Sequence, residues 1–531
     1  MLFAVRSAAA LHRVLDTLPV FEGDHRIRRR FTLAPGSDFG IDALAALEAV
    51  GARGVPWDVA VSESYDLIVA ASPKGELDRL HGPIVLLPHG AGFNKTVRGD
   101  GADDSASGLD PAFLMRGDRP LAALHALAHP SQLARLADRC PPAAARAAVV
   151  GDPTLDRVLE SQPLRDRYRA ALGTGDRRLI VLASTWGPES LLARRPTLPE
   201  QLASQLPLDE YQLALVAHPN VHSSPGTFDL TERLPREVFL ARPHEEWATL
   251  LVAADAVVTD HGSTALYAAA LDRPMVAAYG GGGELLPSTP MAQLLAAVPR
   301  LRDPGQLGEL LAAHRPGVCL EAGRAAFHVS VQGRALERLR AELYDRLGLT
   351  PVSPPPDPRL LPLPRRPVDG PAAFAVRTDV HDGLVRVERR PARTDVPSHH
   401  LAAEEDMVGT HHAQSAGLLY RRATGEGEDT NEGAAVAWTP EGWTAEALAR
   451  YPNCRTAGVI LGPERCLVRR RDSAETLLRV RIEPCEEQGR VFHPDPAAIL
   501  SAVHALASGT SGTRELNCLI GQRTYRVHLA E

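Results

Sequence analysis

The residues best suited to chemistry form a short polar turn, Asp260-His261-Gly262-Ser263-Thr264, between an apolar run and an Ala-rich segment that ends at Pro274. This order predicts a strand, a turn and a helix, with the small residues at the start of the helix. The first backbone N–H groups of a helix have no partner within it, and the helix dipole is positive there. A phosphate can therefore approach the backbone closely. We expect a nucleotide-diphosphate site at Gly262, with Ser263 and Thr264 contacting the anion.

Two histidines also follow apolar runs. His89 stands before a glycine and is expected to point into a cleft, where it would act as general base for an acceptor hydroxyl, a role worth about 10²–10⁴ in rate. His218 would donate to the diphosphate or protonate the leaving group. Asp260 would orient His218 or His261, or cap the helix, because a carboxylate and a phosphate repel each other. The alternative for His89 and His218 is a purely structural hydrogen bond.

Three weaker features complete the set of polar segments. The loop Gly280–Gly283 follows an expected strand and could close over a ligand. Lys95 and Arg98 could hold an anionic acceptor, but we expect them to be solvated surface charges. Histidines 399–400 and 411–412 flank a run of acidic residues, but adjacent pairs do not give a regular metal-ligand spacing, so we expect a polar loop and no metal site.

These motifs need a scaffold of parallel strands. Continuous apolar runs alternate with helical runs over the first part of the chain, and the alternation restarts at Arg178. Such runs are typical of strands buried on both faces of a parallel sheet. Every polar motif above comes directly after an expected strand, and ligands of open α/β sheets bind at the carboxyl ends of strands. We therefore expect an α/β chain in which two doubly wound halves face each other across a cleft.

The expected elements divide the chain into four segments. Domains are predicted at residues 1–160 and 161–348, a Pro-rich linker at 349–371, and an α+β accessory domain at 372–531. In the first domain the helices are expected at 8–18, 41–50 and 121–137. In the second, the strands are expected at 178–183, 212–217, 238–240, 256–259 and 274–279. The accessory domain is expected to be antiparallel, with strands at 384–390, 457–461, 466–470, 477–482 and 523–529, a helix at 496–507, and a loop-rich stretch at 402–432.

The composition and net charge of the chain limit the classes of protein to which it can belong. The 531 residues are 44% hydrophobic and 23% charged, which is typical of globular domains, and the net charge of −7 disfavours a nucleic-acid or anionic-membrane binder. No segment is apolar enough to span a bilayer, and residues 1–6 are expected to be a strand and not a signal peptide. The six cysteines are widely spaced without a Cys-x-x-Cys pair, which suits buried thiols in a cytoplasmic protein.

Five segments, in order, resemble the CDP-glycerol glycerophosphotransferases that build teichoic acid. They span roughly residues 60–300 and match the family's His-Gly, Gly-x-Pro, strand-end Thr-Trp, His-Pro and Thr-Asp-x-x-Ser motifs. The resemblance implies a GT-B-like pair of Rossmann-type doubly wound parallel-sheet domains. It also implies that a CDP- or UDP-linked donor is the substrate, that no resident cofactor or metal is needed, and that the acceptor is a polymer or lipid-linked molecule. The matching segments are Leu87–Lys95, Val149–Pro153, Val181–Trp186, Val216–Asn220 and Leu250–Ser263.

The resemblance assigns roles to matching positions. His89, His218 and Asp260 are the catalytic candidates, and the nucleotide-binding candidates are Thr185, Asn220, Gly262, Ser263, Thr264 and Tyr267. The chain departs from the family in three places: His261-Gly262 replaces Tyr-Ser, Gly92 stands where a proline is expected, and Tyr267 stands where an acidic residue is expected. The departures leave two alternatives open. One is a UDP-sugar transferase or UDP-N-acetylglucosamine 2-epimerase, and the other is a binding scaffold whose site has drifted and whose C-terminal domain carries a protein partner.

Overall fold

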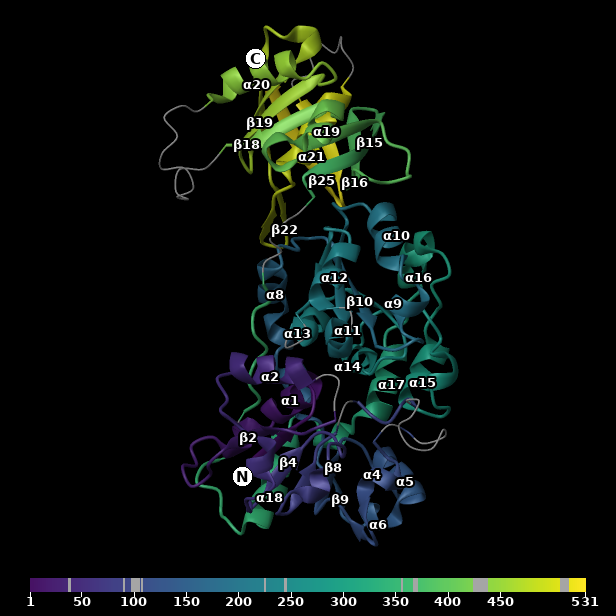
Figure 1. The fold of residues 1–531 in the computed structure, drawn as a ribbon. Coiled ribbons are helices and arrows are strands. Elements are labelled where there is room, and N and C mark those ends of the chain that lie inside the picture. The colour runs from purple at the N-terminus through teal and green to yellow at the C-terminus, as the bar shows by residue number, and fades with distance from the viewer. Residues whose placement is uncertain are drawn as a thin grey trace.

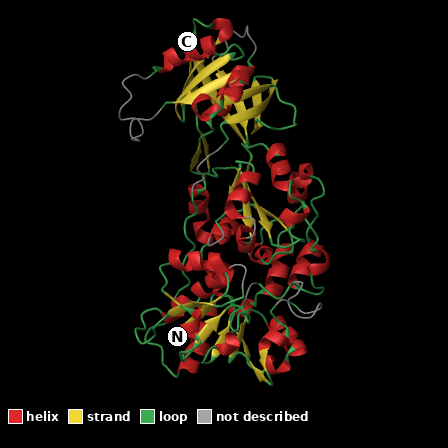
Figure 2. Cartoon of the chain, viewed as in Figure 1, coloured by secondary structure: helices red, strands yellow, loops and turns green. Residues whose placement is uncertain are grey.

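The computed structural model consists of three bodies stacked along one axis, with the N-terminus in the lowest body and the C-terminus in the highest (Figure 1). Parallel sheets covered by helices form the lower two bodies, and a barrel forms the third (Figure 2). The structure describes residues 1–36, 40–88, 91–96, 106, 108–223, 226–242, 246–354, 357–365, 371–423, 438–506 and 515–531.

The first body is a parallel sheet in which the chain starts at a central strand. Its core strands are almost fully buried, as their continuous apolar runs predict. The helix expected within residues 121–137 is present as α5, which starts at Pro130, and residues 124–127 before it form a strand that was not predicted. The Ala- and Leu-rich composition favours helix, but burial on both faces allows a strand of the same composition. The strand order is β3 (Gly54–Val55), β2 (Arg30–Leu33), β1 (Leu2–Val5), β4 (Ile68–Ala70), β5 (Ile84–Leu86), β8 (Leu124–Leu127) and β9 (Ala147–Val149).

Helices cover both faces of this sheet, and a small hairpin lies beside it. Pro or a polar side chain starts several of them, as with Asp152, which caps the helix that leads into the second body. The helices are α1 (Ala8–Leu15), α2 (Gly40–Ala49), α3 (Trp57–Ala60), α4 (Pro111–Leu114), α5 (Pro130–Arg139), α6 (Pro141–Ala144) and α7 (Pro153–Glu160), and the hairpin is β6 (Met115–Arg116) with β7 (Arg119–Pro120).

The second body repeats the same winding, and all the strands expected there are confirmed. The strands are parallel in the order β12 (Val238–Leu240), β11 (Tyr211–Ala217), β10 (Arg178–Ser184), β13 (Ala256–Thr259) and β14 (Met275–Ala277). Its helices are α8 (Arg165–Ala171), α9 (Leu191–Arg194), α10 (Leu198–Gln205), α11 (Pro219–Ser223), α12 (Gly226–Arg233), α13 (Glu246–Ala253), α14 (Thr264–Ala270), α15 (Pro290–Ala297), α16 (Leu307–Ala312) and α17 (Val318–Ala326).

Helix α18 (Ala335–Leu347) ties the second body back to the first. Its apolar face packs in the core of the first sheet, where the ring of Tyr344 stacks on that of Phe21 with centroids 6.1 Å apart. Its first turn is held by the buried carboxylate of Asp156 in α7, which accepts from the backbone N–H groups of Gly333 (2.6 Å) and Ala335 (2.8 Å). The two sheets are therefore joined by a crossing helix in addition to the direct connection through α7.

The described part of the Pro-rich linker, residues 357–365, runs along the second body. Leu361 is buried in the core of that body, where its N–H donates to the hydroxyl of Ser161 (2.9 Å) and its carbonyl accepts from the hydroxyl of Tyr168 (2.8 Å). The linker is thus packed onto the protein over this stretch, which the Pro-rich composition alone does not predict.

The third body is a closed barrel around a buried helix, α21 (Pro496–Ala505). The expected strands and this helix are present, but the prediction of an antiparallel module is wrong because β16–β24, β17–β18 and β18–β19 pair in parallel. The stretch at 402–432, expected to be loop-rich, contains the end of one strand, a helix and one complete strand in its described part. The barrel order is β15 (Ala373–His381), β16 (Leu384–Pro391), β24 (Glu515–Ile520), β25 (Arg523–Ala530), β21 (Leu477–Ile482), β20 (Arg465–Arg470), β19 (Thr456–Gly462), β18 (Leu418–Arg422) and β17 (His400–Glu404), with β22 (Cys485–Glu487), β23 (Arg490–Phe492), α19 (Thr410–Ser415) and α20 (Pro440–Arg450) outside it.

A buried arginine joins the barrel to the second body. Arg389 of β16 contacts Asp209, which precedes β11, at 2.6 Å and Asp495, which caps α21, at 2.8 Å. Because all three charges are largely removed from water, loss of one partner would leave an uncompensated buried charge. No helix in the described part of the chain is long and apolar enough to cross a membrane. Within the same residues, no group of three or more His, Cys, Asp or Glu side chains could hold a metal ion.

Two buried imidazoles predict acid sensitivity of the barrel. The rings of His400 and His504 lie 4.3 Å apart, and burial lowers the pKa of His400 to about 3 and that of His504 to about 4. Since an unfolded histidine has a pKa near 6.5, the unfolded chain binds more protons between about pH 6.5 and pH 4. The barrel should therefore lose about 2 kcal/mol of stability per histidine from pH 7 to pH 5, measured by hydrogen exchange of α21 corrected for intrinsic rates. His400→Gln should remove part of this loss, whereas exposed His381→Gln should keep it; equal losses would contradict the prediction.

Candidate functional site

A cavity of about 230 Å³ lies between the first two bodies, at the carboxyl ends of β10, β11 and β13. Most of the predicted site residues in the described part of the chain line it, which the placement of each motif after a strand leads us to expect. The lining includes α1, the segment after β5, the segment after β10, the segment after β11, the turn between β13 and α14, and the linker residue Leu361. Its polar and aromatic members are His12, Arg13, Asp16, Asn94, Lys95, Thr154, Arg157, Ser184, Thr185, Trp186, His218, Trp247, His261, Ser263, Thr264 and Tyr267.

Asp260 lies behind the cavity wall and holds three backbone segments together. Its side chain is fully buried and accepts hydrogen bonds from the N–H groups of Thr185 (2.9 Å), Leu191 (2.7 Å) and Gly262 (2.8 Å). Burial raises the pKa of this carboxyl, while the three N–H donors and the nearby His261 oppose that shift. Because its oxygens serve these N–H groups, Asp260 acts in this geometry as a positioning residue behind the wall.

The turn after β13 brings Gly262, Ser263 and Thr264 to the cavity. A Cβ atom at Gly262 would lie 3.1 Å from Asp260 Oδ1 and 3.1 Å from Thr185 Cβ, so the turn closes on the end of β10 only without a side chain there. Ser263 precedes α14 and its hydroxyl makes no capping hydrogen bond within the described residues. Its hydroxyl is therefore available to a ligand in this cavity, together with that of Thr264.

His218 follows β11 and faces the same cavity. Its Nδ1 accepts from the backbone N–H of Asn220 at 3.1 Å, so the neutral ring carries its proton on Nε2 and presents a donor. The ring lies 6.1 Å from that of Trp186, which follows β10. Asn220 orients His218 through its backbone, and its side chain is not part of the cavity wall described above. The geometry therefore places His218 at the cavity and Asn220 behind it.

Lys95 is not the solvated surface charge that the sequence suggests. Its ammonium lies over the Trp186 ring at 5.0 Å, 3.4 Å from the Thr185 hydroxyl and 3.8 Å from a Glu284 carboxylate oxygen. Burial lowers the pKa of Lys95, and Glu284 and Asp260 act against that shift. A largely buried ammonium at the cavity wall can bind an anionic group of a ligand. Arg98 lies outside the described residues.

The lysine is placed by a short contact between the two bodies. Backbone N–H groups of Thr96 and Leu286 donate to the carbonyls of Glu284 and Asn94, both at 2.9 Å, so segments 94–96 and 284–286 run side by side. Glu284 also lies 3.2 Å from Nε2 of buried His261. The segment that carries Lys95 therefore meets the end of the glycine loop.

That loop needs its glycines for two steric reasons. Gly281 has φ 84°, and a Cβ atom there would lie 3.0 Å from the Cβ of His261. At Gly282 (φ 50°) an added Cβ would lie 2.3 Å from a carboxylate oxygen of Glu189. Both positions thus combine a left-handed backbone with a close approach that a side chain would block. The glycines let the loop pack directly beneath His261.

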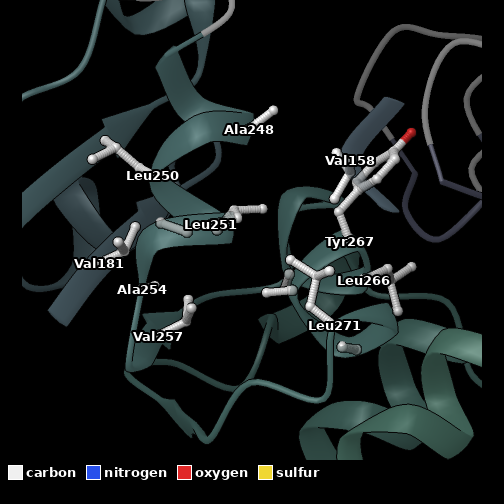
Figure 3. Close-up of a cluster of buried hydrophobic side chains, with 14 of the residues drawn as sticks. Val158, Val181, Ala248, Leu250, Leu251, Ala254, Val257, Leu266, Tyr267 and Leu271 are labelled. Atoms are coloured by element: carbon white, nitrogen blue, oxygen red, sulfur yellow. The ribbon is translucent and has the colours of Figure 1, made fainter. Parts of the chain in front are cut away.

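Tyr267 joins the two bodies across the cavity floor. Its hydroxyl donates to Asp152 (2.8 Å), the guanidinium of Arg13 lies 5.2 Å from its ring centroid, and its side chain is fully buried. Figure 3 shows the ring beside Val158 of α7, among side chains of the second core. Burial raises the pKa of Tyr267 well above its usual value. Tyr267, which stands where the resemblance leads us to expect an acidic residue, is thus hydrogen-bonded to a carboxylate at the edge of the first body.

Sequence reasoning missed several of these residues. Arg13 and His12 line the cavity from α1, and Asp152 and Glu284 hold Tyr267 and Lys95. A signal existed for Asp152, which stands inside the Gly151-Asp152-Pro153 motif. His89 lies outside the described residues, so its role remains a prediction.

Part of this chain matches a known protein family. A model of the family described as CDP-glycerol:poly(glycerophosphate) glycerophosphotransferase matches residues 130–280. The predicted resemblance is confirmed for this segment. The match covers the motifs at β9, β10, β11 and β13 and excludes the His89 segment and the barrel. It also confirms the prediction of an enzyme of the transferase type. No match is found among curated protein sequences.

Several solved structures share part of the architecture at low sequence identity. The wall teichoic acid polymerase TagF aligns with 16% identity over 65% of this chain and 84% of its own, with a TM-score of 0.41. S. aureus MnaA with UDP aligns with 11% identity over 66% and 98%, with a TM-score of 0.43. Anabaena HepE with UDP aligns with 16% identity over 65% and 99%, with a TM-score of 0.38.

The contacts of Asp260 predict a large effect of a small substitution. In Asp260→Asn an NH₂ group would face backbone N–H donors that the carboxylate now accepts, so at least one buried donor would lose its partner. We expect a loss of about 2–4 kcal/mol in the free energy of unfolding, measured by urea denaturation. Exposed Asp303, which caps a short turn through Gly305, is the matched control. Asp303→Asn should change stability by less than about 0.5 kcal/mol, and an equal effect of both variants would contradict the role of Asp260.

Proposed function

We propose that the protein transfers a glycerol-phosphate, another polyol-phosphate or a sugar from a CDP- or UDP-linked donor to an acceptor hydroxyl. The first two bodies would form a GT-B-like pair, with the donor held mainly by the second. The observation that carries this proposal is the single cavity that gathers Thr185, His218, Ser263 and Thr264 at the carboxyl ends of neighbouring strands. Three motifs far apart in the sequence thus supply polar groups to one space.

The donor diphosphate would lie at the turn after β13. There the hydroxyls of Ser263 and Thr264, the Nε2–H donor of His218 and the ammonium of Lys95 offer hydrogen bonds and positive charge to phosphate oxygens. Lys95 and His218 are held by Glu284 and by the backbone N–H of Asn220 before any ligand arrives, so they need little reorganisation as charge develops on the leaving phosphate or diphosphate. Removal of water by Trp186 and Trp247 would strengthen each of these interactions.

The acceptor side of the cavity belongs to the first body. His89 would take the proton from the acceptor hydroxyl as its oxygen attacks the donor. Attack on the phosphorus would break the phosphoanhydride bond and release the nucleoside monophosphate, whereas attack on the anomeric carbon would break the bond from that carbon to the diphosphate and release the nucleoside diphosphate. The neighbouring segment 91–96 lies between the bodies, which places the chain just after His89 at the cavity. The acceptor would be a polymer or lipid-linked molecule, and the barrel could carry a protein partner.

One observation favours an epimerase as a second candidate. Buried His261, Glu284 and Lys95 form a chain of titratable groups at the cavity wall, with His261 Nε2 3.2 Å from Glu284. Such a set could exchange a proton with a sugar carbon of a UDP-linked donor. Conversion of UDP-N-acetylglucosamine in the absence of an acceptor would select this candidate. A drifted binding scaffold would instead bind nucleotide without turnover.

Nucleotide binding tests the proposed donor site. Calorimetric titration with CDP, UDP and GDP should give binding that prefers one nucleotide. Ser263→Asp should weaken that binding by more than about ten-fold, or ~1.4 kcal/mol, because the new carboxylate repels the diphosphate. Ser263→Asn, of similar size and uncharged, is the matched control and should retain most of the affinity. Absence of binding to all three nucleotides would overturn the donor assignment.

Turnover tests the proposed base. With an active donor and acceptor, His89→Ala should lower kcat by about 10²–10⁴ with little change in donor affinity. Exposed His381 of the barrel provides the control, and His381→Ala should leave kcat unchanged. Unchanged turnover in His89→Ala would remove His89 from the mechanism.

A further inference from the structure

A second cavity, of about 450 Å³, adjoins the first on the side of the N-terminal body. It lies between the end of α1, the segment after α2, the start of α7, α18 and the linker at Pro358. Apolar side chains such as Phe31 contribute to its wall. Of the sequence motifs only Pro153 of the Val149–Pro153 segment reaches it, and none of the proposed donor contacts falls in it.

The charged side chains that line this cavity are arginines, apart from one aspartate. Arg29, Arg53, Arg157 and Arg359 line it, and the one acidic side chain in its wall is Asp16. Asp16 is already paired, since its carboxylate contacts Arg157 at 2.7 Å and accepts from the hydroxyl of Thr154. Within the described part of the chain no carboxylate pairs with Arg29, Arg53 or Arg359, and all three are exposed. In a chain of net charge −7, this concentration of unpaired guanidinium groups predicts an anionic ligand.

The two cavities share a wall. Asp16 and Arg157 line both of them. Arg157 also donates through Nε to the carbonyl of Arg359 at 2.8 Å, which fixes the linker at the rim of the second cavity. An extended ligand with one end in each cavity would therefore pass the ion pair of Asp16 and Arg157.

We propose that the arginine-lined cavity binds phosphate groups of the acceptor while the reacting hydroxyl of the same molecule lies in the first cavity. This rests on the proposed function, because it assumes a phosphate-containing acceptor chain. Guanidinium groups bind phosphate oxygens through paired N–H donors, and carbon atoms of the chain would pack against the apolar wall. Contacts in both cavities would make binding stronger for a longer chain than for one phosphate, since the second contact is then intramolecular.

Calorimetric titration with synthetic glycerol-phosphate oligomers tests this assignment. The full-length protein should bind an oligomer of several phosphates at least about ten-fold more tightly than glycerol 3-phosphate or inorganic phosphate. The double variant Arg29→Gln/Arg53→Gln should lose most of this preference for the oligomer over a single phosphate. The control Arg236→Gln/Arg315→Gln makes the same change of charge on exposed side chains of the second body and should keep it. Thermal unfolding of both variants should match that of the unmodified protein, because all four side chains are exposed.

Each outcome decides the proposal. If both double variants weaken oligomer binding equally, the attraction is a general effect of charge and the proposed site is wrong. The proposed site is also wrong if neither double variant weakens oligomer binding. Inorganic phosphate that binds as tightly as the oligomer would assign the cavity to free phosphate and overturn the acceptor role. Titration of the same variants with CDP and UDP separates this proposal from the donor function. If neither the unmodified protein nor the variants bind nucleotide, the proposed donor site is wrong. The arginine-lined site is still supported in that case if oligomer binding depends on Arg29 and Arg53.

Discussion

The carboxylate of Asp260 is the interaction on which the shape of the cavity depends. By accepting from the N–H groups of Thr185, Leu191 and Gly262, it fixes the ends of two neighbouring strands and the turn into α14 relative to one another. The N–H groups of Thr185 and Gly262 lie just past the ends of β10 and β13, and that of Leu191 lies at the start of α9, so no ladder or helix satisfies them, and a buried donor without a partner is costly. One side chain therefore joins two strand ends and a helix start into a single wall, from which Thr185 and Ser263 face the cavity.

A second set of contacts fixes that wall relative to the first body. Tyr267 bonds to Asp152, Asp156 caps α18, and segment 94–96 runs beside segment 284–286. In paired α/β domains of this kind, relative motion is the default when the interface is small and polar. Here a crossing helix and buried hydrogen bonds oppose such motion. Opening of the cavity would require loss of the contact between Asn94 and Leu286, which is local and made by backbone groups alone.

The sequence predicted the parts of the structure that rest on local patterns. Strands such as β10 and β13 are continuous apolar runs, and polar residues after them must fall at one edge of a parallel sheet, so the positions of Thr185 and Ser263 followed. Lys95 was mistaken for a surface charge because its partner Glu284 lies far along the chain. The parallel pairs of the barrel were missed for the same reason, since strand direction is set by which strands meet and not by their composition. At β8 burial on both faces removed the alternation that distinguishes strand from helix.

Net charge was informative about the whole molecule and misleading about its parts. A value of −7 disfavours a polyanion-binding protein, yet unpaired arginines converge beside the cavity from segments as distant as Arg29 and Arg359. The screening length in physiological salt is about 8 Å, so a ligand there responds to the few charges around it and hardly to the total. The basic run Arg28-Arg29-Arg30 contributes only Arg29 to the cavity, and the other arginines come from different elements. Only the return of the linker past Arg157 brings Arg359 to the others.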